Sequence, residues 1–522
     1  MEVINRNIKN ILKDIILIVF FGGILTTAFS PFNIFLTIFF SFYFLVYIVE
    51  NNIYKNYLYI FILIIIFLYS HFYTGLRWIS CSFDSSSSTK EEFGWAKYIT
   101  QLGLPLILVW PQSIGLLLAF GITKSIGKCV NNIQNHKQNS FHYEYSYKKC
   151  YYDNNFSVTH FTKQQKYILS ILLAFFWVLG EKLRINYIEP FPWLLLSHIS
   201  VYHPILLQLI EILEIEGLGF YIVILAITPY VNCCRWSFAI GLISSLLFSW
   251  SYWRYHYISS LKISLPPILI VQAGIKEPPQ NNNEKIKALE KIIFLTQNAQ
   301  AIAHKQYKKS IIIIWPESAM QFPINYNNKF IPLNWSNKNF DDILISGVDR
   351  IKKNKKNIYF YNSLIILNKS GSIIGEYDKI NLAPFGEYMP WKGFLSKLTP
   401  LSVSESDFEK GKLPQEVFIP MFNTTIIPYI CYDIAFDEKN LSKKIINNNS
   451  NNFIIHIAND SWFRDSIGLY QHLAMSQIKA VQLRRYLVRV ANMGVSGIIT
   501  PTGDIIYKLP VNYIGAKFYN IN

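Results

Sequence analysis

The chain contains few cysteines and few charged residues for its length. Six cysteines occur in 522 residues and no two form a C-x-x-C pair, which excludes a dense disulfide framework and the ligand spacing of a zinc site. Charged residues make up only 16% of the chain and hydrophobic residues 51%, with a mean hydropathy of +0.21. The net charge is +16, but the lysines are scattered and no basic motif interleaved with aromatics occurs, which argues against nucleic-acid binding. This composition is too apolar for an ordinary soluble enzyme.

Long apolar runs fill the first half of the chain. Only helices satisfy their own backbone groups inside a bilayer, so these runs predict a transmembrane helical domain over residues 1–255 with about seven spans. The first run follows basic residues as a signal peptide does, but it lacks a small-x-small cleavage site and we interpret it as retained. The runs lie at about 12–29, 33–50, 57–74, 102–122, 167–184, 218–233 and 235–253.

The loop 123–166 sets the predicted orientation of this domain. It holds seven lysines against Glu144 and Asp153, and the positive-inside rule therefore makes it cytoplasmic. Seven crossings then place everything after residue 255 on the outer face. An error of one span would invert that orientation.

The segment 185–217 is apolar but is interrupted by prolines and acids. We expect it to lie on the outer face as an interfacial or re-entrant segment, with Trp193 at headgroup depth. Glu181 and Arg184, near the end of a span, are interpreted as anchors that snorkel toward the headgroups.

Residues 256–522 have a different pattern, in which short β-branched runs alternate with polar stretches typical of helices. This alternation predicts a layered α/β domain with its chemistry at strand ends. The expected strands are Ile268–Val271, Lys309–Trp315, Asp342–Val348, Ser363–Asn368, Thr425–Cys431 and Phe453–Ala458, and the expected helices are Asn283–Gln306 and Gln471–Leu487.

Three of the polar segments in this half carry reactive groups. "IIIIWPESAM" leads to Glu317, "EYDKINLAPFGEYMP" carries Lys379, and "IIPYICYDIAF" contains Cys431. A thiol, an amine and a carboxylate are the set that acyl transfer through a thioester needs: a nucleophile, an electropositive group that lowers the thiol pKa and stabilises an oxyanion, and a base. Taken singly, the three residues read as a surface carboxylate, a surface lysine and a core cysteine.

The sequence around these residues resembles the glutamate–lysine–cysteine motifs of the nitrilase, or carbon–nitrogen hydrolase, superfamily. Within it, the closest resemblance is to the apolipoprotein N-acyltransferase family. "WPES", "YDKINLAPFGEYMP" and "ICYDIAF" occur in the family's order. "GGILTTAFSPF", "EPFPWLLL" and residues 458–505, which begin "ANDSWF", extend the likeness over almost the whole chain.

The resemblance implies a transmembrane bundle joined to a nitrilase-like αββα sandwich, and an enzyme that acylates the N-terminal S-diacylglyceryl cysteine of apolipoproteins. Cys431 would attack a phospholipid acyl ester with Glu317 as general base. Lys379 and the backbone N–H of Tyr432 would stabilise the oxyanion. The thioester on Cys431 would then pass its acyl group to the α-amine of the acceptor.

The resemblance also assigns supporting roles. Glu387 would orient Lys379, and Tyr388, Tyr432 and Asp433 would bind substrate. Apart from the resemblance, we expect the loop around Trp462 to contact the lipid substrate, because both substrates are lipid-anchored. No metal or diffusible cofactor is implied. The enzyme would act as a monomer, as a multi-pass protein of the bacterial inner membrane with its catalytic domain facing the periplasm.

The chain departs from the family pattern in places. Asp433 stands where the family usually has glutamate, and Arg464 where glycine is common. The family tryptophan after the segment that here reads Gln272-Ala273-Gly274 is absent, and no apolar span closes the sequence.

Two other functions remain open at this stage. A membrane-tethered amidase of nitrilase type, which gives its thioester to water or a small amine, would use the same three residues. A non-catalytic membrane scaffold with a degenerate hydrolase domain is disfavoured because Glu317, Lys379 and Cys431 are all present.

Overall fold

The computed structural model divides the chain into two compact units. The first comprises Met1–Arg77, Tyr98–Tyr202 and Ile212–Trp250, and the second comprises Trp78–Lys97, His203–Glu211 and Ser251–Asn522. The second unit therefore takes two internal segments and residues 251–255 from the predicted membrane half. The residues that the structure describes are 2–53, 56–84, 94–141, 160–188, 190–261, 264–276, 279, 281–336, 339–354, 357–384, 386–388, 407–412, 416–436 and 452–520.

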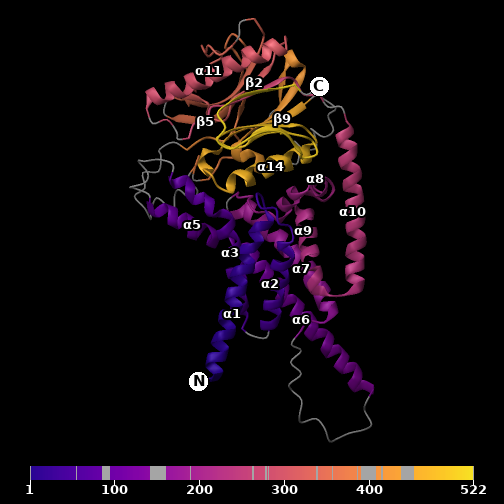
Figure 1. The fold of residues 1–522 in the computed structure, drawn as a ribbon. Helices are drawn as coiled ribbons and strands as arrows, with labels where there is room; N and C mark the ends of the chain where they lie inside the picture. Colours follow the sequence, from indigo (N-terminus) through magenta and orange to yellow (C-terminus); the bar gives the residue numbers. More distant parts are fainter. Residues whose placement is uncertain are drawn as a thin grey trace. The chain divides into compact units, whose positions relative to one another are not determined.

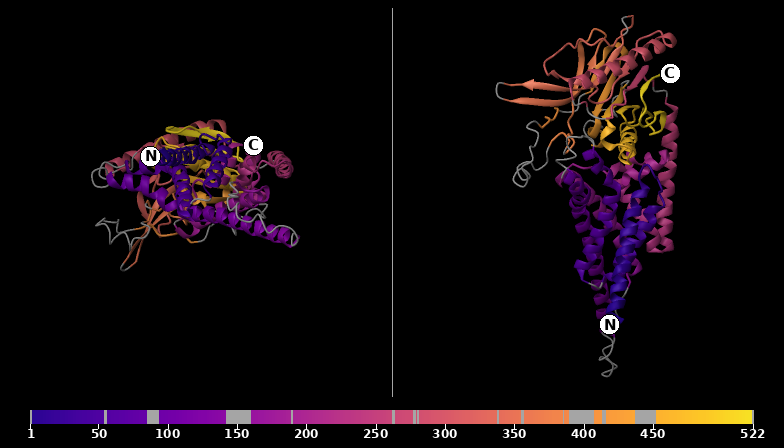
Figure 2. Two further views of the ribbon diagram at one scale, coloured as in Figure 1. Left: turned by 90° about the horizontal axis from the view of Figure 1, so that it is seen from below. Right: turned by 60° about the vertical axis from the view of Figure 1, so that its left-hand side comes forward.

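The first unit is built of long helices that lie side by side (Figure 1 and Figure 2). Among the described residues, three helical segments are long and apolar enough to cross a membrane: Ile8–Ala28, Tyr57–Cys81 and Thr100–Ile126. The total of seven crossings stays a prediction. The helices, some of which run from one unit into the other, are α1 (Glu2–Leu25), α2 (Thr37–Asn52), α3 (Tyr57–Leu76), α5 (Gly94–Leu108), α6 (Trp110–Phe141), α7 (Lys163–Leu183), α8 (Pro204–Leu207), α9 (Ile210–Val231) and α10 (Cys234–Ser260).

Two expectations for this half need correction. The predicted loop at 123–166 begins as helix, because α6 continues to Phe141; residues 142–159 of that loop lie outside the described part of the chain. Arg184 does not snorkel: its side chain is completely buried and donates a hydrogen bond to the Trp193 carbonyl at 2.8 Å. Glu181 and Trp193 are buried as well, so these side chains hold the first unit together internally.

The second unit contains two mixed β-sheets. One has the order β13-β1-β2-β4-β5-β6 with β3 paired to β4, and the other the order β12-β11-β10-β9-β8-β7. The strands of the first are β1 (Ile268–Gln272), β2 (Ile312–Ile314), β3 (Met320–Asn325), β4 (Ile343–Lys353), β5 (Ile358–Leu367), β6 (Ile373–Asp378) and β13 (Gly515–Tyr519). Those of the second are β7 (Val417–Ile419), β8 (Thr424–Ile430), β9 (Asn452–Asn459), β10 (Leu487–Asn492), β11 (Ser496–Ile499) and β12 (Ile505–Leu509).

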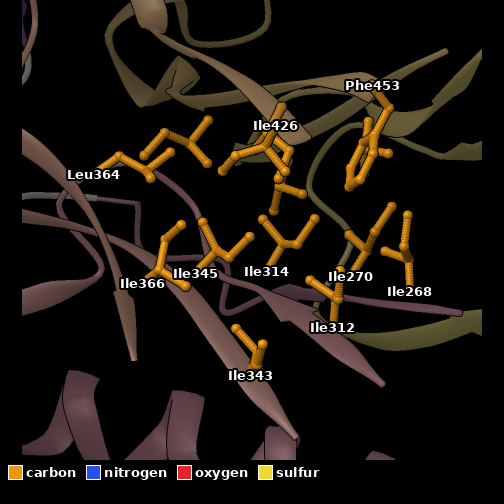
Figure 3. Packing of buried hydrophobic residues seen from close by; sticks show 14 of the residues in the cluster. Ile268, Ile270, Ile312, Ile314, Ile343, Ile345, Leu364, Ile366, Ile426 and Phe453 are labelled. Carbon is orange, nitrogen blue, oxygen red and sulfur yellow. The ribbon is translucent and has the colours of Figure 1, made fainter. Parts of the chain in front are cut away.

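Side chains from both sheets interlock in the middle of this unit. Ile314 and Ile345 of one sheet meet Ile426 and Phe453 of the other in a single buried cluster (Figure 3). A second cluster lies between the first sheet and α11 (Asn282–Gln306), and α14 (Gly468–Leu483) lies on the far side of the second sheet (Figure 1). Helix, sheet, sheet and helix thus form four layers, which confirms the predicted αββα sandwich.

Strands β8, β9 and β10 are parallel neighbours, and so are β1, β2 and β4. Parallel strands in the middle of a sheet are covered on both faces, which explains why these strands are rich in Ile and Val and why all of them but β10 were predicted. The antiparallel β5 was predicted as well, whereas β3, β6, β7, β11, β12 and β13 were missed. The predicted helix over Gln471–Leu487 is too long, because Arg484 at φ +53° ends α14 and Leu487 begins β10.

Candidate active site

Glu317 lies in a turn just beyond the carboxyl end of β2, after Trp315 and Pro316, and its side chain is 7% exposed. Both of its carboxylate oxygens accept a hydrogen bond: Oε1 from the Asn362 amide at 2.8 Å and Oε2 from the backbone N–H of Asn459 at 2.7 Å. Gly347 makes room for it, since a Cβ there would lie 2.6 Å from the Glu317 Cα. These two hydrogen bonds hold the Glu317 carboxylate in one orientation.

Lys379 follows β6 directly and is 1% exposed. Its Nζ lies 2.8 Å from the Glu387 Oε2 and 3.5 Å from the Glu317 Oε1. Burial by itself would lower the pKa of Lys379, but the negative charges of Glu387 and then Glu317 outweigh it and raise that pKa above its usual value. The lysine is thus an ammonium held between two carboxylates.

Glu387 is anchored by three groups. Besides Lys379, it accepts hydrogen bonds from the backbone N–H of Ala383 at 2.7 Å and from the Asn362 amide at 2.7 Å. These contacts are those that the predicted orienting role for Glu387 requires. The role itself stays a prediction.

Cys431 is the residue at which β8 ends and a single 3₁₀ turn, Cys431–Ala435, begins. Its φ of +49° is in the left-handed region, which a side chain with a Cβ rarely occupies, and strain of this kind gathers at functional sites. The structure therefore places the thiol on a sharp turn at a strand end, partly buried.

The electrostatics of the thiol differ from the sequence-based expectation. Lys379 does lower the pKa of Cys431, as expected, but burial and the charge of Glu317 act more strongly and raise that pKa well above its ordinary value. The resting group is a thiol rather than a thiolate. A base must take its proton before it can attack.

Asp433 is 1% exposed and is satisfied by protein groups. Its oxygens accept from the Tyr377 hydroxyl at 3.0 Å and from the backbone N–H of Asn381 at 2.6 Å. Burial raises the pKa of Asp433 to about 7, and Lys379 opposes that rise. This aspartate ties the turn that carries Cys431 to the segment that carries Lys379; the predicted substrate contact stays a prediction.

The other predicted substrate-binding residues have different surroundings. Tyr432 is 6% exposed and packs edge-on against Phe436, with ring centroids 5.1 Å apart. Trp462, in the turn Asp460–Phe463, is 45% exposed. Tyr388 is partly buried, and its backbone forms an isolated β-bridge with Pro384. Contact of any of them with substrate stays a prediction.

Two polar residues of this site were missed in the sequence. Asn362 of β5 joins Glu317 to Glu387 through its amide, and Asp349 of β4 is its direct partner across the sheet. Burial, followed by the charges of Glu317 and Glu387, raises the pKa of Asp349 to about 6. A polar residue in the middle of an apolar strand, as in "FYNSLII", was the available signal.

A small cleft, partly open to solvent, reaches Glu317. Ile275 and Ile292 supply apolar wall, and Asn459 and Ser461 supply polar wall. Within the described ranges no three His, Cys, Asp or Glu side chains are grouped as metal ligands. The chemistry that the residues themselves offer is a thiol nucleophile, a fixed carboxylate base and a buried ammonium for a developing oxyanion.

Two sequence families match this chain. A carbon–nitrogen hydrolase domain matches residues 270–513, and an apolipoprotein N-acyltransferase N-terminal domain matches residues 150–228. The first match contains all three reactive residues, and the second lies in the helical half.

Curated proteins give the same result. An apolipoprotein N-acyltransferase of Rickettsia typhi is 27% identical over 95% of this chain and 90% of its own length. One from Wigglesworthia glossinidia brevipalpis is 30% identical over 64% of this chain; that match spans 65% of the relative, slightly under two thirds of its length. Among solved structures, a nitrilase-superfamily protein of Saccharomyces cerevisiae is 17% identical over 50% of this chain and 91% of its own, with a TM-score of 0.36. The chain is thus similar to apolipoprotein N-acyltransferases over most of its length, and its residues 270–513 are similar to carbon–nitrogen hydrolases, which supports an acyltransferase.

Proposed function

We propose that this protein transfers an acyl chain from a phospholipid to the N-terminal S-diacylglyceryl cysteine of apolipoproteins, in two steps through a thioester on Cys431. The observation that carries the proposal is the site itself: a protonated thiol under the electrostatic influence of a fixed carboxylate, Glu317, and a buried ammonium, Lys379. Similarity to the apolipoprotein N-acyltransferases supports the reaction class, and the names of these relatives support the acceptor.

In the first half-reaction Glu317 takes the proton of Cys431 as the sulfur attacks the ester carbonyl carbon. Lys379 and the backbone N–H of Tyr432 stabilise the oxyanion of the tetrahedral intermediate. The carbon–oxygen bond of the ester breaks, and Glu317 gives its proton to the leaving alkoxide. Lysophospholipid departs and the acyl chain remains on sulfur as a thioester.

In the second half-reaction the neutral α-amine of the acceptor attacks the thioester carbon. Glu317 takes a proton from the nitrogen as the carbon–nitrogen bond forms, and Lys379 again faces the oxyanion. The carbon–sulfur bond breaks and Glu317 returns the proton to the Cys431 sulfur. The products are an amide and the regenerated thiol, so protons and electrons balance without any cofactor.

The helical unit gives this chemistry a location. Both substrates are lipid-anchored, so the thiol must work at a bilayer surface. The helices that can span a membrane support a multi-pass membrane protein. The lysine-rich loop 123–166 and the predicted seven crossings support a bacterial inner-membrane protein with its thiol on the periplasmic side. One chain supplies every named group, so a monomer suffices.

The test is to trap the intermediate. Membranes that contain the full chain are incubated with phosphatidylethanolamine labelled in its acyl chains, and the peptide with Cys431 is analysed by mass spectrometry. A labelled, hydroxylamine-sensitive adduct on Cys431 is expected, and a diacylglyceryl peptide should discharge it much faster than water does. Rapid discharge by water alone would favour an amidase, and no adduct at all would refute the proposal. Cys431→Ala provides the blank.

A further inference from the structure

A buried polar cluster contacts the backbone carbonyl of Cys431. The backbone carbonyl oxygen of Cys431 is 3.1 Å from the Nε2 of His456 and 3.2 Å from the Nε2 of His472. The two histidines come from β9 and α14, which lie side by side (Figure 1). Both are completely buried. The proposed mechanism uses neither of them.

The contacts of His456 determine where its proton lies. Arg489 Nη1 lies 2.8 Å from the His456 Nδ1 and can only donate, so Nδ1 accepts. Burial, with the charge of Arg489, lowers the pKa of His456 well below its ordinary value, so the ring is neutral and carries one proton. That proton must be on Nε2. His456 therefore donates a hydrogen bond to the Cys431 carbonyl.

His472 reaches the same oxygen from the helix. Its Nδ1 is 2.9 Å from the Asp460 Oδ1 and 3.1 Å from the Arg489 Nη2. If the Nε2 of His472 carried no proton, its lone pair would face a lone pair of the Cys431 carbonyl oxygen, 3.2 Å away, and the two would repel each other. The two remaining states, the neutral Nε2–H tautomer and the imidazolium, both donate to that oxygen.

The cluster is rigid because its charges are paired. Asp460 and Arg489 are both 0% exposed and bond to each other at 2.6 Å. The Ser476 hydroxyl of α14 lies 3.0 Å from the His456 Nδ1 and thereby links α14 to β9. Each polar group thus restrains the orientation of the next, as in a fully connected network.

The oxygen that these histidines hold belongs to the peptide between Cys431 and Tyr432. In a trans peptide the C=O and the N–H point in opposite directions, so two donors behind the carbonyl aim the Tyr432 N–H toward the reacting side. They also polarise the peptide, which strengthens its N–H as a donor. Cys431 needs such support because its own φ of +49° is unfavourable for a non-glycine residue.

We propose that His456 and His472 are positioning residues for the oxyanion hole, acting through the Cys431–Tyr432 peptide. The inference rests on the proposed function, since it assumes that the Tyr432 N–H faces an oxyanion formed on an acyl group attached to Cys431. Loss of a direct oxyanion donor costs about 10²–10³-fold in rate. Loss of one of two groups that hold that donor is expected to cost on the order of 10-fold, and loss of both on the order of 100-fold.

The experiment compares two reactions of the same sulfur in full-length protein. Thioester formation from labelled phosphatidylethanolamine passes through an oxyanion. Alkylation by iodoacetamide needs only a deprotonated, accessible thiol. Both rates are measured on the peptide containing Cys431 by mass spectrometry, so the other cysteines do not interfere. The variants are His456→Leu, His472→Leu and the double variant, with His456→Gln and His472→Gln to restore an N–H donor.

The expected result is a fall of about 10-fold in thioester formation for each leucine variant, an alkylation rate within about threefold of wild type, and partial recovery with glutamine. The matched control is His304→Leu, another buried histidine of this unit, which lies on α11 and contacts Asp342 at 2.8 Å. It should leave both rates unchanged.

A parallel fall of both rates, or no fall in thioester formation, would overturn the positioning role. Should a leucine variant lose its unfolding transition, the glutamine variants decide: recovery of the transition without recovery of the thioester rate overturns the proposal too. Failure of the proposed function has a different signature, because wild-type protein itself would then form no thioester on Cys431.

Discussion

Removing the charge of Lys379 tests the electrostatic core of the site. Lys379→Met keeps the length and apolar stem of the side chain but deletes the ammonium that lies 2.8 Å from Glu387 and 3.5 Å from Glu317. At an effective dielectric constant of about 20, each of these attractions is worth about 5 to 6 kcal/mol before desolvation is subtracted. Breaking a buried ion pair costs about 3–5 kcal/mol net, because a charge is left unpaired.

The loss should depend on pH in a defined direction. In the wild type the pKa of Lys379 is raised, so its contribution to stability is complete below its unfolded-state pKa and is the same at mildly acidic and mildly basic pH. In the variant, Glu317 and Glu387 face each other as two like charges without a cation, and acidic pH relieves that repulsion.

The stability difference between wild type and Lys379→Met should therefore be larger at about pH 8, where it approaches 3–5 kcal/mol, than at about pH 5.5. For a domain of this size that is a fall of roughly 10 °C in the unfolding midpoint. The assay is thermal unfolding of the full chain in detergent at both pH values, beside thioester formation. Lys329→Met is the matched control, since the Lys329 side chain is 73% exposed and its ion pair with Glu376 is long, at 3.7 Å. This variant should change neither the unfolding midpoint nor the rate of thioester formation. An equal loss at both pH values would refute this electrostatic account of the site.

Three further outcomes are expected. Gly347→Ala should displace Glu317, because the new Cβ would lie 2.6 Å from the Glu317 Cα, and should lower the thioester-formation rate by about 10²-fold or more while the protein still folds; a rate within threefold of wild type would contradict the close approach. Asp433→Asn turns one acceptor into a donor beside the backbone N–H of Asn381, and should cost about 1–3 kcal/mol in a denaturant titration; an unchanged midpoint would show that the contact is unimportant. Trp462→Ala removes a half-exposed aromatic side chain, and should impair transfer from phospholipid vesicles more than it lowers the unfolding midpoint; equal loss of both would mean that Trp462 serves packing instead.

Two of the reactive residues were predictable because each stands where an apolar run gives way to polar residues. Glu317 follows "IIIIWP" and Cys431 follows "IIPYI", so the chain itself marks two strand ends, whereas Lys379 follows the polar "GEYD" and was identified by its resemblance to a family motif. Parallel buried strands produce such runs without any knowledge of their neighbours. The charge of Lys379 likewise follows from its side chain, and only its partners needed the structure.

The tertiary structure decided everything that depends on pairing. Asn362 and Asp349 sit within strands, and only the register of β4 against β5 brings them to Glu317 and Glu387. The sign of the shift in the Cys431 pKa was also beyond the sequence, because burial and a neighbouring carboxylate outweigh the lysine only at the distances that the fold sets.

Local sequence thus determined the elements of this protein: apolar helices long enough for a bilayer, most of the buried parallel strands, and Glu317 and Cys431 near the ends of two of those strands. Contacts between distant segments determined the rest. Sixteen residues (472 − 456) separate the two histidines behind the nucleophile, and 25 (456 − 431) separate the nearer one from Cys431. Hydrophobic periodicity reports which face of an element is buried, but it does not report which buried polar groups will meet there, since that depends on strand order and on how α14 packs against its sheet.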